Sequence, residues 1–215
     1  MKRSFIISMG ITIVMAIIAV WFVVTTKGDI PIHWGMSGEV NGYGSPLTMI
    51  IFPITSLLIV LLLYFIPRLD PKANNIKASG PILQVMMILL SVLMLGIEII
   101  IIMAVNGSNI FNINIFISLL LAVLFVAMGY YLPTVKHNYM IGIRTPWTLY
   151  SENVWVKTHK MSKNWLIAVG VVFVISMLLK MPYSLIIPLV FMAIVMIGIV
   201  VYSYIAFAEE KKMNK

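Results

Sequence analysis

Residues 81–104 read PILQVMMILLSVLMLGIEIIIIMA, and Glu98 is the only charged side chain in this run. About 20 consecutive apolar residues are enough for an α-helix to cross the hydrocarbon core of a bilayer. The run is apolar throughout, whereas the strands of a membrane β-barrel alternate between apolar and polar residues. The stretch therefore predicts a transmembrane helix.

Comparable apolar runs lie on both sides of it, at residues 4–25, 47–66, 112–132, 164–181 and 184–207. The whole chain is 61% hydrophobic and only 10% charged, a balance far from that of a soluble domain. We predict an all-α polytopic membrane helical bundle with about six transmembrane helices. The fifth run is the shortest and the fourth is the most polar, so five or seven spans remain open.

The net charge of +8 is unevenly distributed along the chain. With the N-terminus in the cytoplasm, only Lys27 and Lys180 of the 15 Lys and Arg residues fall outside. This positive-inside pattern predicts that both termini are cytoplasmic. It also explains the charge without direct nucleic acid binding, since no basic face accompanies a soluble recognition fold. The first run lacks a cleavage signal and is expected to remain as a signal anchor.

The most polar stretch is the predicted cytoplasmic loop at residues 133–163. Thr145-Pro146 has the form of a helix cap followed by a first-turn proline, and Ser151-Glu152 offers a second helix start. Several residues that follow share one helical face: Val154, Trp155, Thr158 and Met161. We therefore expect this segment to lie along the membrane surface.

Within the loop, Arg144 has the planar guanidinium that binds a carboxylate, a phosphate or backbone carbonyls, and Trp147 is placed to stack over it. His137 and His159 flank these residues, and we predict packing roles for both. The other predicted cytoplasmic connection, residues 67–80, reads as a solvated connector with no assigned chemistry.

The predicted external loop between the first two runs is rich in glycine. Asn41-Gly42 is a strong turn signal, and Trp34 and Tyr43 suit the aromatic belt of a membrane interface. A compact loop on the outer surface is expected, with His33 as a turn residue. The spacing of His33, Glu39 and Asp29 matches no firm metal-ligand pattern.

Glu98 is the only acid inside a predicted span. An ionisable group there is a functional hypothesis, either for proton coupling or for binding a cationic partner. The alternative is a protonated or hydrogen-bonded Glu that packs against a neighbouring helix. The choice stays open.

The chain has no cysteine, no paired carboxylates, no His-Glu-x-x-His and no glycine-elbow serine. Thiolate catalysis is excluded, and hydrolase and metalloprotease chemistry lack their groups. We predict no catalytic residue, no metal and no cofactor.

Two ordered sets of residues resemble known sequences. The polar-loop set closely resembles the signature of the SdpI family: Asn138, Tyr139, Gly142, Arg144, Thr145, Pro146, Trp147, Thr148, Trp155 and His159. The external set resembles a short membrane domain of unknown function that often precedes it: Pro31, His33, Trp34, Gly38, Glu39, Gly42, Tyr43 and Gly44. One departure is Ser45-Pro46, where this domain often has Ser-Lys. We expect a two-helix region at 1–80 and an SdpI-like four-helix region at 81–215.

The resemblance implies a multi-pass protein of the bacterial cell membrane that confers immunity to an SDP-type secreted peptide toxin. Some family members also signal by recruiting a transcriptional repressor to the membrane. The expected partners are therefore membrane lipids, the toxin and such a repressor. The alternative is a small proton-coupled transporter or lipid-handling protein that uses Glu98 and Arg144.

Overall fold

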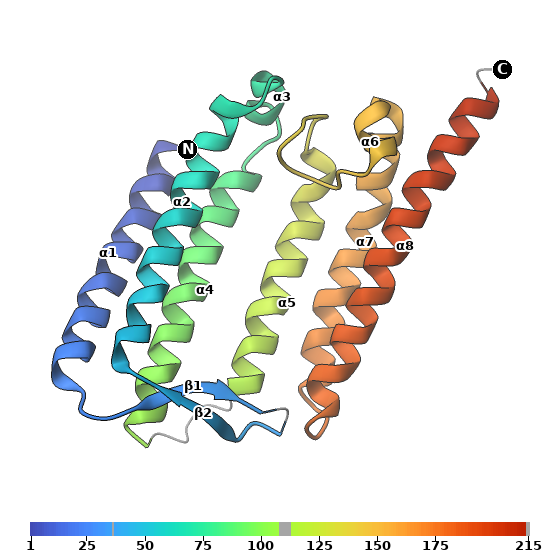
Figure 1. Ribbon diagram of the computed structural model, residues 1–215. Coiled ribbons are helices and arrows are strands. Elements are labelled where there is room, and N and C mark those ends of the chain that lie inside the picture. The colour runs from blue at the N-terminus through green and yellow to red at the C-terminus, as the bar shows by residue number, and fades with distance from the viewer. Residues whose placement is uncertain (36, 108–112, 214–215) are drawn as a thin grey trace. The chain divides into compact units, whose positions relative to one another are not determined.

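The computed structural model describes residues 1–35, 37–107 and 113–213. These residues form eight α-helices and one two-stranded hairpin (Figure 1). The helices are α1 (Lys2–Thr25), α2 (Ile51–Leu69), α3 (Ala73–Lys77), α4 (Ile82–Val105), α5 (Ile113–Tyr131), α6 (Pro146–Tyr150), α7 (Glu152–Ser176) and α8 (Tyr183–Met213). The strands are β1 (Ile30–Trp34) and β2 (Val40–Gly44), and 3-10 turns cover Pro46–Ile50 and Leu132–Thr134. The predicted all-α membrane class is confirmed.

Five of the described helices are long and apolar enough to cross a membrane: Lys2–Thr25, Pro46–Leu69, Ile82–Val105, Ile115–Thr134 and Tyr183–Met213. The fourth predicted run begins at Asn112, which lies outside the described residues. The fifth predicted run differs most from expectation. It is the second part of α7, which starts at Glu152, includes polar residues through Lys163 and ends at Ser176. The predicted surface segment and the predicted fifth span are therefore one continuous helix.

The chain packs into two compact units that alternate along the sequence. Unit 1 contains Met1–Tyr64, Leu83–Leu120 and Lys180–Pro182, and unit 2 contains Phe65–Ile82, Leu121–Leu179 and Tyr183–Lys215. These units are compact in space, whereas the two-helix region expected at 1–80 and the four-helix region expected at 81–215 are consecutive stretches of sequence. That expected division stays a prediction.

In unit 1, β1 and β2 form an antiparallel hairpin between α1 and α2. The predicted turn at Asn41-Gly42 is wrong, because both residues lie in β2, and His33 lies in β1 rather than in a turn. Gly42 is opposite His33, and a Cβ on Gly42 would lie 2.8 Å from the His33 Cβ. Close cross-strand approach, rather than a turn, is what requires glycine there.

The actual turn lies between Gly35 and Glu39. The Gly35 N–H donates to the Glu39 carbonyl at 2.8 Å, and the Gly38 N–H donates to the Gly35 carbonyl at 2.9 Å. Gly38 has a φ of 89°, a conformation that favours glycine. The hairpin is anchored by Ile30, which is buried in a cluster with Phe22 and Met49. The expected compact loop is thus a hairpin seated on the helices of its unit.

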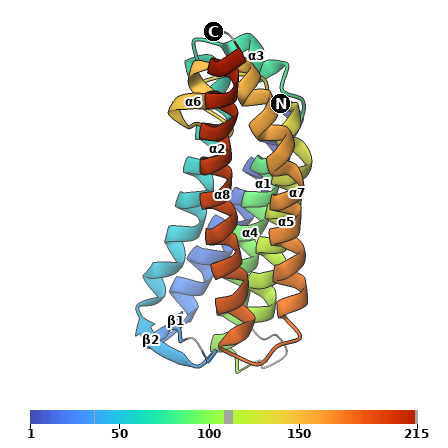
Figure 2. The same cartoon turned by 90° about the vertical axis from the view of Figure 1, so that its right-hand side faces the viewer.

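In unit 2, α7 and α8 run side by side, as Figures 1 and 2 both show. Several residues of α7 face the interior of this unit rather than a membrane surface: Val154, Trp155, Thr158 and His159 are all buried. The prediction of a surface-lying amphipathic segment is therefore wrong. The sequence correctly indicates that these residues share one face of a helix. The rest of the protein, rather than lipid, covers that face.

Candidate functional site

The residues that precede α7, 132–151, are named the motif loop here, and residues 70–81 are named the connecting loop. Asn138 organises the first half of the motif loop. Its buried side-chain amide donates to the carbonyls of Lys136 at 2.8 Å and Ile141 at 3.1 Å. Its side-chain oxygen accepts from the N–H groups of Met140 and Ile141, both at 2.8 Å. One side chain thereby fixes a turn of the backbone.

The predicted cap at Thr145 is confirmed. The Thr145 hydroxyl accepts from the Thr148 N–H at 3.2 Å, and the Thr148 hydroxyl accepts from the Thr145 N–H at 2.9 Å. This reciprocal capping box starts α6, with Pro146 in its first turn. The Thr148 hydroxyl also donates to the Ile143 carbonyl at 2.7 Å. The short helix is therefore tied to the turn before it.

Gly142 brings the loop backbone onto α7. It has a φ of 111°, and a Cβ at this position would lie 2.5 Å from His159 Nε2 and 3.0 Å from the Trp155 ring. The rings of Trp155 and His159 stack with their centroids 4.1 Å apart. Only glycine has both the required backbone conformation and the required absence of a side chain.

Hydrogen bonds define the protonation state of His159. Its Nδ1 lies 2.8 Å from the Trp155 carbonyl, which can only accept, so Nδ1 carries the proton. Nε2 then accepts from the Ile143 N–H at 3.2 Å. Burial lowers the pKa of His159 to about 4, so the ring is neutral near pH 7.

The connecting loop is hydrogen-bonded to the motif loop along its length. Asp70 accepts from the Tyr139 N–H at 2.8 Å and from the Lys72 N–H at 2.6 Å. Asn75 donates to the His137 carbonyl at 2.7 Å, and Ser79 accepts from the Lys136 N–H at 2.9 Å. The prediction of a solvated connector without a role is therefore wrong. A signal was present, since Asp70 is the only acid in that basic loop.

His137 joins the same network. The Lys72 ammonium lies 2.7 Å from His137 Nδ1, and an ammonium can only donate, so Nδ1 accepts. The Nε2–H of His137 then donates to the Leu149 carbonyl at 3.1 Å. The Lys72 ammonium also lies 5.3 Å from the centre of the Tyr139 ring. Both histidines thus have structural partners.

Two further contacts attach this region to α8. The Ser151 hydroxyl donates to Glu210 at 2.7 Å and also accepts from the Val154 N–H at 3.3 Å, which confirms the predicted cap. Asn153 donates to the same carboxylate at 2.9 Å. Glu210 was not predicted as a site residue, because it lies at the far end of the chain.

Arg144 is exposed and donates from Nη1 to the Tyr139 carbonyl at 2.7 Å. Trp147 does not have the predicted position over it. Its ring instead packs against Tyr204 of α8, with centroids 5.2 Å apart. Trp147 therefore attaches the motif loop to α8, and Arg144 presents a cation at the surface.

The predicted external residues occupy the hairpin of unit 1. Pro31, His33 and Trp34 lie in β1, Gly42, Tyr43 and Gly44 lie in β2, and Gly38 and Glu39 lie in the turn. His33 Nδ1 contacts the Asn41 side-chain oxygen, and Ser37 donates to Glu39. Tyr43 is 63% exposed. Within the described ranges, no three His, Cys, Asp or Glu side chains form a metal cluster.

Glu98 lies in α4, in unit 1, and is completely buried. Neither of its carboxyl oxygens has a hydrogen-bond partner among the residues that the structure describes. Such a group is costly to bury unless it is neutral or meets a ligand. The functional role and the packing of a neutral Glu98 therefore both stay open.

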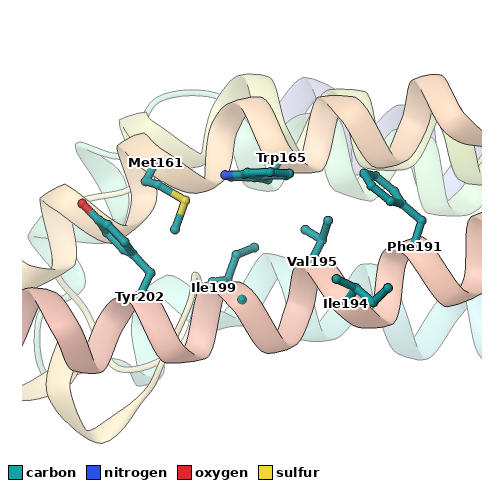
Figure 3. Close-up of a pocket in the computed structure, with 8 residues that line it drawn as sticks. Met161, Trp165, Phe191, Ile194, Val195, Ile199 and Tyr202 are labelled. Atoms are coloured by element: carbon teal, nitrogen blue, oxygen red, sulfur yellow. The ribbon is translucent and has the colours of Figure 1, made fainter.

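An apolar pocket of about 330 Å³ lies between α7 and α8, and Figure 3 shows its lining. Its residues are Met161, Trp165, Phe191, Ile194, Val195, Gly198, Ile199 and Tyr202. Among the labelled side chains, the only nitrogen belongs to Trp165 and the only oxygen belongs to Tyr202 (Figure 3). A lining of this kind suits an apolar chain or side chain rather than a charged ligand.

The long apolar helices and the hydrogen-bonded loops define a multi-pass helical membrane protein with a preorganised polar surface. Residues 134–204 match the model of the SdpI/YfhL protein family, and residues 10–57 match that of a domain of unknown function (DUF1648). The chain is 26% identical over 190 residues to the immunity protein SdpI of Bacillus subtilis (strain 168). That alignment covers 86% of each protein. No solved structure shows a significant match.

These findings confirm the resemblance to the SdpI family and to the domain that precedes it. The two matches contain the two sets of residues from which the resemblance was inferred. The 134–204 match covers the motif loop from Thr134 onward, and the 10–57 match covers the hairpin.

Proposed function

We propose that this protein is a membrane immunity protein that protects a bacterium against a secreted peptide toxin of the SDP type. The observation that carries the proposal is the similarity to immunity protein SdpI over 86% of both proteins. An alignment of this length overlaps both matched regions. No reaction is assigned to the chain.

The proposed location is the bacterial cytoplasmic membrane, with both termini in the cytoplasm and the second part of α7 crossing the membrane as a sixth span in addition to the five long apolar helices. The distribution of Lys and Arg supports this orientation, because all but Lys27 and Lys180 fall on the cytoplasmic side. The hairpin then faces outward, where a secreted toxin arrives. Exposed Tyr43 and the polar residues around His33 are the proposed first contacts.

In the same orientation the motif loop faces the cytoplasm. Its buried residues form a rigid framework, while Arg144 is exposed at its surface. A fixed backbone with an exposed guanidinium suits recognition of a cytoplasmic protein, because little conformational entropy is lost on binding. We therefore assign the proposed recruitment of a transcriptional repressor to this surface.

Deletion of the gene tests the proposed immunity. The deletion strain should become sensitive to the cognate SDP-type peptide, and the intact gene supplied in trans should restore growth. Unchanged sensitivity across a panel of SDP-like peptides would count against the proposal.

A proton-coupled transporter is the second candidate, and the buried, unpartnered Glu98 carboxyl favours it. A neutral amide cannot carry a proton or pair with a cation. Glu98→Gln should therefore abolish proton-coupled flux in proteoliposomes if this function is correct. Protection from the toxin by the Glu98→Gln variant, without flux for any substrate tested, would leave immunity as the function.

A further inference from the structure

A second pocket lies in unit 2, where α5 meets the start of the motif loop. It is an open pocket with a volume of about 560 Å³, and it is lined by Pro81, Tyr130, Tyr131, Pro133, Thr134, Lys160 and Lys163. This volume is in the range of small-ligand sites. The lining contains none of the residues that carry the family resemblance, so the proposed immunity function leaves this pocket unexplained.

The pocket has a net positive lining. Lys160 and Lys163 are three residues apart on α7 and therefore share a helical face. No acidic side chain is among the described residues that line it. Two acids of unit 2 are hydrogen-bonded elsewhere, Asp70 to the motif loop and Glu210 to the start of α7. The lining thus favours an anion.

The walls of the pocket are held by tight packing. A Cβ on Gly129 would lie 2.8 Å from the Lys163 carbonyl oxygen, so α5 and α7 are in backbone contact here. The Tyr130 and Tyr131 rings meet edge to face, with centroids 5.0 Å apart. The Lys163 ammonium lies 5.8 Å from the centre of the Tyr130 ring, which holds the cation at the pocket.

The position of the pocket along the chain suits contact with lipid headgroups. Tyr130 and Tyr131 are close to the end of the apolar helix Ile115–Thr134, and tyrosine is enriched at membrane interfaces. Basic pockets between helices at this level bind phosphate-bearing headgroups. A lysine ammonium is a compact charge that pairs well with a phosphate oxygen.

We propose that Lys160 and Lys163 form a binding site for a phosphate group, either that of an anionic lipid headgroup or free phosphate. The two ammonium groups would neutralise the phosphate oxygens, and the tyrosine rings would pack against the remainder of the ligand. The proposal is independent of the immunity function.

Native mass spectrometry and thermal unfolding of the purified full chain test this site. The probes are phosphatidylglycerol, phosphatidylcholine as the neutral-headgroup control, and inorganic phosphate against chloride at equal ionic strength. Wild-type protein should retain phosphatidylglycerol over phosphatidylcholine. The double variant Lys160→Gln/Lys163→Gln should weaken anion binding about thirtyfold, since each lysine contributes about fivefold.

Two control variants show whether the effect belongs to the pocket. Lys157→Gln removes a charge from the same helix outside the pocket and should bind as wild type. Lys160→Arg/Lys163→Arg keeps both charges and should keep binding. Stabilisation by the lipid alone supports the headgroup as ligand, and stabilisation also by inorganic phosphate supports free phosphate.

Three results would overturn the proposal. They are equal retention of the two lipids together with no stabilisation by inorganic phosphate, wild-type binding by the double glutamine variant, and an equal loss in Lys157→Gln. The first comparison uses wild-type protein alone, so the proposal stays testable if the double variant does not fold.

Discussion

Trp155 and His159 form the surface on which the motif loop packs. The Trp155 indole N–H donates to the Val135 carbonyl at 2.8 Å, and His159 connects the Trp155 carbonyl to the Ile143 N–H. Both side chains are essentially fully buried. Their side-chain hydrogen bonds go to the backbone, so at the residue scale they determine the path of the loop.

The neutral state of His159 makes stability depend on pH. Burial lowers the pKa of this ring from 6.5 to about 4 in the folded protein, so the unfolded chain protonates first as pH falls. Stability is complete above about pH 6.5 and should fall between pH 6.5 and 4, by roughly 3 kcal/mol if this group acts alone. Unfolding of the detergent-solubilised protein across this range measures it.

The matched variant is His159→Phe. It should be less stable at pH 7.5, because the Ile143 N–H loses its acceptor, but its stability should change less between pH 6.5 and 4. Parallel pH profiles for the variant and the wild type would show that another group titrates.

Gly142 gives a second residue-scale prediction. Gly142→Ala adds a Cβ 2.5 Å from His159 Nε2 at a φ of 111°, and should lower the free energy of unfolding by roughly 2–4 kcal/mol. Gly80→Ala is the control. Its φ is also positive, at 70°, but its nearest neighbour is 3.5 Å away, so roughly 1 kcal/mol is expected. Equal losses in thermal unfolding would mean that the contact with His159 is unimportant.

At the element scale, the connecting loop and the motif loop stabilise each other. Asp70→Ala removes the acceptor of the Tyr139 and Lys72 N–H groups and should destabilise unit 2 by roughly 2–4 kcal/mol. Asp70→Asn keeps one side-chain oxygen as an acceptor and should lose less stability than Asp70→Ala. The stability of both variants is measured by thermal unfolding and by the rate at which a protease cleaves the motif loop. Glu209→Ala, at an exposed acid, is the control, and a loss as large as that of Asp70→Ala would contradict the assignment.

The elements differ in how far the sequence predicts them. Helices α1, α2, α4 and α8 follow from long apolar runs, because a helix satisfies its backbone within one segment. The caps at Thr145 and Ser151 follow from local chemistry. The helical conformation of the first half of α7 also follows from the sequence, but its burial does not, since the residues that cover this face lie far away in the chain. The hairpin register was also missed, because glycine at Gly42 serves a cross-strand contact rather than a turn.

The candidate site shows the same limit. The ordered motif predicted which residues gather in the loop, and Asn138, Gly142 and Thr148 all have specific contacts there. Asp70 and Glu210 accept from Tyr139 and Ser151, which are 69 and 59 residues away from them in the chain. The sequence marks Asp70 as the only acid of its loop, but no local pattern indicates the partner of either acid. The position of Trp147 against Tyr204 was missed for the same reason.

At the scale of the whole molecule, protection and signalling should be separable. Arg144→Gln removes an exposed cation that makes one hydrogen bond to the loop, so folding should change by less than about 1 kcal/mol. Toxin protection should persist, while toxin-induced expression of the immunity gene should be lost. A transcriptional reporter measures this, with Lys157→Gln as the control. Full reporter induction by Arg144→Gln would show that this surface is not used for signalling.

The most direct measurement of the central claim is the toxin dose that kills a sensitive bacterium with and without this protein in its membrane. Expression should raise the lethal dose of an SDP-type peptide and leave the lethal dose of an unrelated pore-forming peptide unchanged. Killing at the same dose as an empty-vector strain, with the protein demonstrably present in the membrane, would contradict the account.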